Sequence, residues 1–161
     1  MSPESIFPST AVDKFVSLRS ELNRRNLIYI VTKQIPFCYG HRLLDYDGKC
    51  AHPHGHNGLA EIELSSDSLD PRGMVADFGD IKKVMKEWID EKIDHKMILR
   101  RDDPLVPLLQ ELQEPLFLVD TNPTAETIAR LLYDQALAAG FPVTQVTLWE
   151  TANSFAVYRK S

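Results

Sequence analysis

Residues 54–64 alternate between two kinds of side chain, and this alternation constrains the fold more than any other stretch of the chain. The even positions carry two histidines followed by small or apolar residues, whereas Glu61 and Glu63 occupy the opposite face. A period of two is typical of a strand with one buried face. The pattern therefore predicts a half-buried strand whose inner face begins with His54 and His56.

Histidines are concentrated just before and within this strand. Four of the five histidines of the chain lie between positions 41 and 56, and His54 and His56 should point to one place because they are two residues apart on a strand. His41 can supply a third nitrogen, since the intervening chain is polar and long enough to fold back. Three histidines with a vacant fourth position are typical of a catalytic zinc site rather than a structural one.

Two cysteines and one further histidine accompany this cluster. Cys50 lies four residues before His54, where it could be a fourth metal ligand, a buried bystander, or a reactive thiolate whose pKa is lowered by its neighbours. Cys38 is interpreted as a small apolar filler, and reduced thiols fit the metal-ligand spacing better than a disulfide does. His52 is interpreted as an exposed loop residue, because Pro53 breaks the strand.

Composition places the chain among globular proteins and argues against several functions. The 161 residues are 43% hydrophobic and 25% charged, with a net charge of −5, so the charge of the whole chain offers no attraction to nucleic acid. No apolar run approaches the roughly 18 residues that cross a bilayer, and the first residues lack the layout of a secretory signal. We therefore expect a cytoplasmic protein with no nucleic-acid or membrane partner.

The remaining segments predict an α+β domain over residues 27–161, preceded by an N-terminal extension, 1–26, with a short amphipathic helix at 11–24. Six elements are expected in the order strand, strand, helix, helix, strand, strand: 27–37 ending near Pro36, 54–64, 78–91 capped by Asp77, a helix from Asn122-Pro123-Thr124 to Gly140, 143–150 and 155–158. That order predicts an antiparallel sheet covered on one face by two helices. Residues 101–120 hold three prolines and two short apolar bursts and receive no assignment.

Two further places carry polar side chains whose role the residues alone leave open. Asp94-His95 follows the first helix, where the helix dipole favours a histidine without any catalytic role. Glu150 shares the inward parity of Val146 and Leu148, so its carboxylate should point into the covered face of the sheet or into an interface. An inward carboxylate needs a partner, which is either a ligand with paired N–H donors or a structural salt bridge.

Together these residues resemble the signature of the 6-pyruvoyl/6-carboxytetrahydropterin synthases. The resemblance runs in collinear order over about residues 28–159, and it rests on five elements: Cys50-x-x-x-His54-Gly55-His56 with His41 and a phenylalanine upstream, Asp77-Phe78, Asp94-His95, Asn122-Pro123-Thr124-Ala125-Glu126 and Trp149-Glu150-Thr151. Tyr39-Gly40 departs from it, because the family commonly has two alanines before the first zinc histidine. The segment between Asp94-His95 and Asn122 is also longer than in compact bacterial members.

The resemblance implies the tunnelling fold, typically in hexamers of two stacked trimers with active sites between subunits. It also implies a bound zinc ion and a reduced pterin, 7,8-dihydroneopterin triphosphate, as substrate. The site residues that it implies are the zinc ligands His41, His54 and His56, the catalytic thiol Cys50, the partner dyad Asp94 and His95, often supplied by a neighbouring chain, the pterin-gripping carboxylate Glu150 and the ring-contacting Thr124.

Two products are compatible with this resemblance. The pterin side chain is either retained as pyruvoyl or cut to a carboxylate with loss of acetaldehyde, which is the step toward queuosine and other deazapurines. Glu150-Thr151-Ala152 and Asn122-Pro123-Thr124 look closer to the bacterial enzymes that form 6-carboxy-5,6,7,8-tetrahydropterin, so we favour the carboxy product. The alternatives are a 6-pyruvoyltetrahydropterin synthase and a non-catalytic pterin-binding scaffold. The presence of Cys50, Asp94 and His95 together argues against the scaffold.

Overall fold

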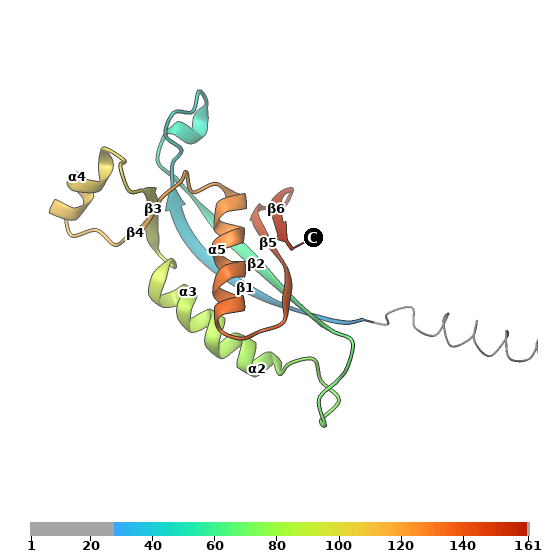
Figure 1. Ribbon diagram of the computed structural model, residues 1–161. Coiled ribbons are helices and arrows are strands. Elements are labelled where there is room, and N and C mark those ends of the chain that lie inside the picture. The colour runs from blue at the N-terminus through green and yellow to red at the C-terminus, as the bar shows by residue number, and fades with distance from the viewer. Residues whose placement is uncertain (1–27, 161) are drawn as a thin grey trace, which may run out of the picture.

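The computed structural model describes residues 28–160, so the predicted N-terminal extension and its helix at 11–24 lie outside the described residues. The described residues form a six-stranded sheet in the order β4-β3-β1-β2-β5-β6, with helices packed on one face (Figure 1). The strands are β1 (Tyr29–His41), β2 (His54–Ser66), β3 (Lys96–Arg100), β4 (Leu116–Val119), β5 (Val143–Thr151) and β6 (Ser154–Arg159). The α+β fold class is therefore confirmed.

The two longest strands, β1 and β2, form an antiparallel pair at the centre of the sheet. Each has 13 residues, and their register places His41 opposite His54 and Tyr39 opposite His56. The predicted alternation of residues 54–64 is confirmed, because its apolar even positions are fully buried in the core: Ala60, Ile62 and Leu64. The histidines therefore begin the same face that forms the core further along β2.

β1 continues to His41, beyond the end predicted near Pro36. Cys38 directs its backbone N–H to Asp94 and its backbone C=O to the N–H of His95, on the edge of β1 that faces away from β2. Because backbone groups two residues apart on a strand point the same way, the ring nitrogen of Pro36 also lies on that edge. The ladder to β2 therefore needs no donor from this proline, and the strand runs through it.

The first predicted helix, 78–91, is confirmed as a continuous helical stretch. It comprises α2 (Phe78–Ile81), a π-helical turn η2 (Lys82–Lys86) and α3 (Glu87–Lys92). Asp77 caps it as predicted, because its side chain accepts a hydrogen bond from the backbone N–H of Gly79 at 2.7 Å. This stretch and α5 lie side by side and form one helical layer over a face of the sheet (Figure 1).

The buried stripe of this helical stretch is rotated relative to the predicted one. The helical spacing of the apolar residues predicts a stripe formed by Phe78, Ile81, Val84, Met85 and Trp88. Of these, Phe78 and Val84 are exposed. The side chains that are fully buried instead recur every fourth position: Ile81, Met85, Ile89 and Ile93. A spacing of four drifts by about 40° per step around an α-helix, and the wider π turn offsets part of this drift.

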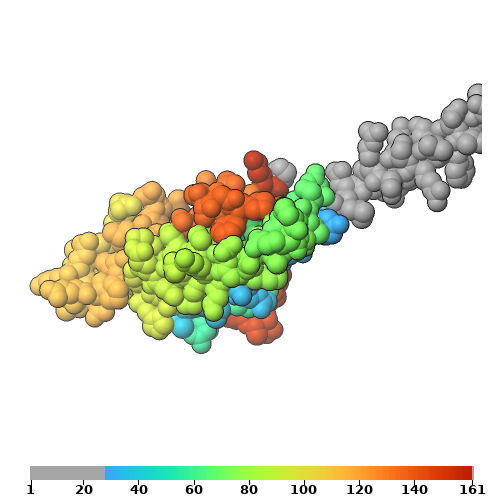
Figure 2. Space-filling view, turned by 90° about the horizontal axis from the view of Figure 1, so that it is seen from below, coloured from blue at the N-terminus to red at the C-terminus, as the bar shows by residue number. Residues whose placement is uncertain are grey.

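The segment that received no assignment contains two elements that the sequence did not reveal. α4 (Leu105–Glu111) and β4 lie there, and β3 precedes them. β3 pairs in parallel with β1, and β4 pairs in parallel with β3, so the expectation of a wholly antiparallel sheet is corrected: the sheet is mixed. Both strands are short apolar runs without alternation, which is typical of parallel strands and hard to distinguish from other buried segments. Figure 2 shows the segment around α4 at one end of the molecule.

The second predicted helix is confirmed as α5 (Ala125–Ala138). Thr124 is its N-cap, and Gly140 follows its end with a φ of +85°, a left-handed conformation that suits glycine. Its inner face is buried at Ile128, Leu132, Tyr133 and Ala136. α5 packs across β5 and β6, so it closes the core over the C-terminal half of the sheet.

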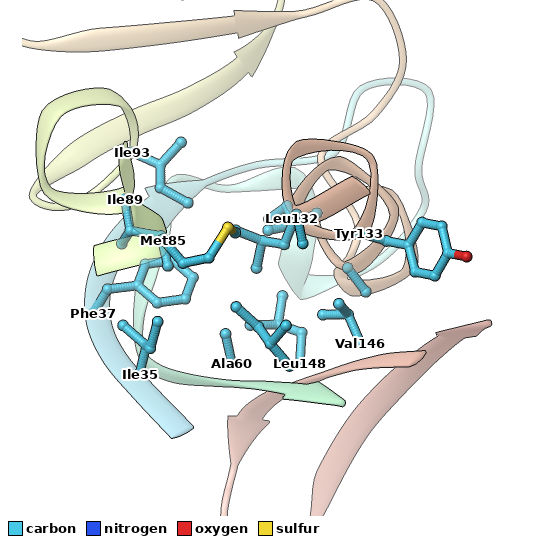
Figure 3. Packing of buried hydrophobic residues seen from close by; sticks show 14 of the residues in the cluster. Ile35, Phe37, Ala60, Met85, Ile89, Ile93, Leu132, Tyr133, Val146 and Leu148 are labelled. Carbon is cyan, nitrogen blue, oxygen red and sulfur yellow. The ribbon is translucent and has the colours of Figure 1, made fainter. Parts of the chain in front are cut away.

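The core lies between the sheet and the helices that cover this face of it. Figure 3 shows Met85 reaching toward Leu132 of α5, above Ala60 and Leu148 of the sheet. The predicted C-terminal hairpin is confirmed as β5 and β6, with an irregularity in the pairing between Trp149 and Thr151. Within residues 28–160, no helix is both long and apolar enough to span a membrane.

Candidate active site

Three histidines meet at the end of the β1–β2 pair. His41 is the last residue of β1 and His54 the first of β2, while His56 follows on the same face. The Nε2 atom of His41 lies 3.0 Å from that of His54 and 3.2 Å from that of His56, and all three side chains have a ligand atom within 4.8 Å of the others. The convergence expected from the spacing is therefore present.

Backbone carbonyls orient two of these rings. The Nδ1 atom of His41 lies 2.7 Å from the carbonyl oxygen of Pro123, and Nδ1 of His54 lies 2.8 Å from that of His52. A proton on each Nδ1 satisfies these carbonyls and leaves the Nε2 lone pairs directed at one another, as in metal-binding histidines. Burial lowers the pKa of His41, although its contact with Pro123 acts in the opposite direction, so the neutral form that binds metals is favoured. The triad thus fits a metal ion.

His52 shows what sequence reasoning missed here. Its side chain is exposed, as predicted, but its backbone carbonyl holds the ring of His54. The same holds for Pro123, whose carbonyl orients His41. Backbone groups carry no residue identity, so a sequence pattern does not reveal such a contact.

Glu150 lies beside the triad, on the inner face that its parity predicted. Its Oε1 atom accepts a hydrogen bond of 2.9 Å from the hydroxyl of Tyr39, and it lies 3.8 Å from Nε2 of His41 and 3.9 Å from Nε2 of His56. No lysine or arginine within residues 28–160 forms a salt bridge with Glu150. Burial, and then the charge of Glu150, raises the pKa of Tyr39 far above its usual range, so the phenol remains a donor.

A hollow of about 320 Å³ opens over Glu150 and His41. We call it the inner hollow, and the residues that line it include His41, Leu43, Cys50, Thr124, Glu150 and Phe155. They come from β1, the loop after it, the 3-10 turn η1 (Lys49–Ala51), the start of α5, and the β5–β6 hairpin. Four of the eight predicted site residues therefore share one cavity. Cys50 lies outside the group of mutually close metal-ligating atoms, which contains the three histidines.

The tripeptide before α5 holds this wall in place. Asn122 accepts a hydrogen bond from the backbone N–H of Leu44 at 2.9 Å and donates to its carbonyl at 2.8 Å, which clamps the loop between β1 and β2. Pro123 orients His41, and Thr124 accepts from the backbone N–H of Thr127 at 3.3 Å as the cap of α5. The Asn-Pro-Thr motif is thus a local scaffold for the inner hollow.

Asp94 and His95 form a pair, but they lie elsewhere. Oδ2 of Asp94 lies 2.9 Å from Nδ1 of His95, and Oδ1 accepts from the backbone N–H of Cys38 at 2.8 Å. Burial acts to raise the pKa of Asp94, but these hydrogen bonds outweigh it and lower the pKa. The side chain of His95 is 78% exposed, and its φ of 54° lies in the left-handed region.

The exposed histidine faces a second concave surface, which we call the outer basin. It has a volume of about 560 Å³, and its lining includes Cys38, Pro53, His54, Asn57, His95 and Met97. Cys50, Thr124 and Glu150 do not line it. A single chain therefore keeps the Asp94-His95 pair on a different surface from the thiol of Cys50.

A mixed sheet thus carries a histidine triad that could hold a metal ion, beside a hollow lined by a thiol and an oriented carboxylate. Comparison with known proteins identifies the family. The family described as "6-pyruvoyl tetrahydropterin synthase" matches residues 30–161. The chain therefore belongs to the 6-pyruvoyl tetrahydropterin synthase family, as the resemblance of its motifs suggested.

Individual relatives agree with this assignment. The chain is 38% identical over 133 residues to a 6-carboxy-5,6,7,8-tetrahydropterin synthase of Rickettsia conorii, a match that covers 77% of this chain and 95% of the relative. It is 31% identical over 144 residues to the 6-pyruvoyl tetrahydrobiopterin synthase of Pongo abelii, covering 80% and 90%. An uncharacterized protein of Wolinella succinogenes has a similar structure, with a TM-score of 0.72, 31% identity and coverage of 84% and 99%.

Proposed function

We propose that this protein converts 7,8-dihydroneopterin triphosphate and water to 6-carboxy-5,6,7,8-tetrahydropterin, acetaldehyde and triphosphate, a step toward queuosine and other deazapurines. The observation that carries the proposal is the inner hollow, where Cys50 and Glu150 share a cavity with His41 of the histidine triad. A reduced pterin has ring N–H donors that suit a carboxylate and side-chain hydroxyls that suit a metal. The Rickettsia conorii relative and a Haemophilus influenzae relative, 33% identical over 145 residues, both carry the name of this synthase.

The proposed cofactor is zinc, held by His41, His54 and His56. Three neutral imidazole nitrogens with a vacant fourth position suit a catalytic zinc ion. The two carbonyls that fix the rings of His41 and His54 support the same assignment, because such contacts accompany metal-bound histidines. When bound, zinc supplies Lewis acidity, which polarises the substrate hydroxyls and makes the adjacent carbon-bound protons easier to remove.

The residues that line the inner hollow bind the pterin ring and transfer protons. Glu150 accepts hydrogen bonds from N3–H and the 2-amino group of the pterin ring, and Thr124 contacts the ring from the start of α5. Cys50 moves a proton to or from the side-chain carbons, a type of catalysis that contributes roughly 10²–10⁴-fold to rate. The position of Cys50 in the wall of the hollow, outside the metal-ligating group, supports a catalytic role rather than a fourth ligand.

Asp94 and His95 complete the site from a neighbouring subunit. The separation of the outer basin from the inner hollow supports this arrangement, because neither member of the pair lines the cavity that holds Cys50. β6 lies at the edge of the sheet and exposes Phe155 and Val157, which suits association with another sheet. A homohexamer of two trimers is the assembly we propose.

Acetaldehyde decides between the two products. Purified protein and 7,8-dihydroneopterin triphosphate should release triphosphate and acetaldehyde in equal amounts, with one zinc per chain by metal analysis. Triphosphate release with a pyruvoyl pterin and no acetaldehyde would favour the alternative, a 6-pyruvoyltetrahydropterin synthase. The Pongo abelii relative carries the similar name 6-pyruvoyl tetrahydrobiopterin synthase. Pterin binding without either product would instead favour a non-catalytic scaffold.

A further inference from the structure

Tyr39 is the buried residue of this site that no role yet explains. Its side chain is 4% exposed and does not line the inner hollow, yet its hydroxyl is the group that donates to Glu150. It lies two residues before His41, so the two side chains share the inner face of β1. Its position therefore lets it act on a ligand through Glu150, without contact of its own.

The ring of Tyr39 is held from several sides. It stacks on Phe37 with ring centroids 5.3 Å apart, and it meets His41 edge-on at 5.3 Å. On β2, Gly58 leaves the space that the ring needs, because a Cβ atom there would lie 3.0 Å from Cε1 of Tyr39. A ring confined in this way directs its hydroxyl along one line, toward Glu150.

Glu150 itself is anchored at one oxygen and open at the other. Oε1 accepts from Tyr39, whereas the hydrogen bonds within residues 28–160 include none to Oε2. The side chain is 22% exposed and lines the inner hollow. The adjacent irregularity in the pairing of β5, between Trp149 and Thr151, means that the strand alone does not hold this side chain in a regular position.

The chemistry of the anchor suits a carboxylate that must still bind a ligand. A lysine or arginine would orient Glu150 but also neutralise its charge. A neutral hydroxyl forms a charge-assisted hydrogen bond to the anion and leaves the negative charge in place for incoming N–H donors. Fixing one oxygen also reduces the freedom that Glu150 would lose on binding, and this raises affinity.

We propose that Tyr39 is a positioning residue for pterin recognition: its buried hydroxyl fixes Oε1 of Glu150, so that the carboxylate presents its free oxygen to the N–H groups of the ring. This inference rests on the proposed function, specifically on Glu150 as the acceptor for the pterin ring. It extends that function by assigning specificity to a residue that does not line the inner hollow.

A double-mutant cycle tests this role. Neopterin binding is measured by fluorescence for wild-type protein, Tyr39→Phe, Glu150→Gln and the double variant, each with its zinc content and melting temperature. Loss of the oriented hydrogen bond should weaken neopterin binding by about tenfold in Tyr39→Phe. In the Glu150→Gln background, the same change should have less than about a twofold effect, because the two residues act as one unit. Zinc content should remain at one per chain.

Specificity gives a second readout that a purely structural role would not change. Lumazine carries oxygen in place of the 2-amino group of pterin, so it cannot make the full contact with Glu150. The preference for pterin over lumazine should fall in Tyr39→Phe. Tyr133→Phe is the matched control, because it removes another buried tyrosine hydroxyl that lies outside the site. That hydroxyl donates a hydrogen bond of 3.2 Å to the backbone carbonyl of Val143. The control variant should keep wild-type binding and preference.

The outcomes separate this inference from the function on which it rests. If Glu150→Gln binds neopterin as wild type does, Glu150 is not the ring acceptor and both proposals fall. If Glu150→Gln loses binding while Tyr39→Phe retains it, or if the two losses simply add, only the role of Tyr39 is overturned. Should Tyr39→Phe not fold, Gly58→Ala displaces the same ring from β2 and should weaken neopterin binding with zinc retained. Unchanged binding there overturns the role as well.

Discussion

The inner hollow and the outer basin differ in how much chemistry one chain completes. The inner hollow collects His41, the thiol of Cys50 and the anchored carboxylate of Glu150 from three separate parts of the chain. The outer basin is lined by the exposed His95, which pairs with Asp94, and by His54 and His56, but not by Cys50 or Glu150. A carboxylate held by a hydrogen bond from its own chain is preorganised within the subunit, whereas an exposed acid–base pair depends on what is placed against it.

The largest effect is expected from removing His54, a proposed metal ligand that lines the outer basin and lies 3.0 Å from His41 of the inner hollow. His54→Ala deletes one of three nitrogen ligands, so we expect bound zinc and turnover to fall to background. Metal analysis and acetaldehyde release measure the two losses. His52→Ala is the matched control, because His52 contributes a backbone carbonyl that alanine retains. Full zinc occupancy in His54→Ala would contradict the triad.

The next prediction sets the two regions against each other directly. Cys50→Ala and His95→Ala should each lose roughly 10²–10⁴-fold in turnover, as expected when a proton-transfer group is removed. Because we place these residues in sites shared by neighbouring subunits, co-expressed mixtures of the two variants should regain activity. In such mixed oligomers some sites combine an intact Cys50 with an intact His95.

Two controls belong to this experiment. Cys38→Ala should keep near-wild-type turnover, since the Cys38 thiol donates to Asn57 at 3.1 Å and does not line the inner hollow with Cys50 and Glu150. Zinc content should be unchanged in Cys50→Ala, and its loss would make Cys50 a ligand instead. Mixtures that stay inactive, or a monomer that is active in sedimentation, would show that one chain completes the site alone.

A smaller effect is expected where the two regions are joined. Arg42 directly follows His41, the last residue of β1. Its guanidinium forms a bidentate salt bridge with the buried carboxylate of Asp103, which lies just after β3. Asp103→Asn should lower the free energy of unfolding by about 2–3 kcal/mol, because it leaves the guanidinium without its charged partner. Urea denaturation measures this. Asp120→Asn, which removes the exposed partner of Arg101, should change it by less than about 0.5 kcal/mol.

The same pair predicts a pH dependence. Burial acts to raise the pKa of Asp103, but its hydrogen bonds from Arg42 and from the backbone N–H of Leu105 outweigh it and lower the pKa below the ordinary 3.8. A depressed pKa gives stability that is present above the ordinary value and lost as the pH falls through the lower, folded-state value. The difference between wild type and Asp103→Asn should therefore shrink only under acid conditions, below the ordinary pKa.

The smallest effect concerns Thr124, at the wall of the inner hollow. Its side chain caps α5, so Thr124→Ala should lower the free energy of unfolding by about 1 kcal/mol, whereas Thr124→Ser keeps the capping oxygen and should not. If Thr124 also contacts the pterin ring, KM for the substrate should rise in Thr124→Ala beyond what this destabilisation explains. An unchanged KM would limit Thr124 to its capping role.

The sequence predicted the parts of the molecule whose physics is local. Period-two alternation in residues 54–64 identified the buried face of β2 and the convergence of His54 and His56. Capping residues and a C-terminal glycine located both helices. The parity of Glu150 placed its carboxylate on the inner face, where the structure has it beside His41.

The parts that escaped prediction depend on distant partners. β3 and β4 are too short to show a period, and they are strands only because β1 offers a parallel edge. The contact of Tyr39 with Glu150 joins residues 111 positions apart. Tyr39 was visible in the sequence as a departure from the family pattern and shares its parity with His41, but its partner was not. The separation of Asp94-His95 from Cys50 likewise became visible only in three dimensions.

The pairing of His41 with His54 has a consequence for the order in which the molecule acquires its abilities. These two ligands are 13 positions apart and face each other across the β1–β2 pair, so a short loop closure brings them together. The carboxylate of Glu150 joins the site only when β5 pairs with the sheet, because its contact with Tyr39 spans 111 positions. We therefore expect the proposed metal site to form early in folding and the proposed pterin site to form late. Metal content would therefore report only that the β1–β2 pair has formed, whereas pterin binding would require the complete fold.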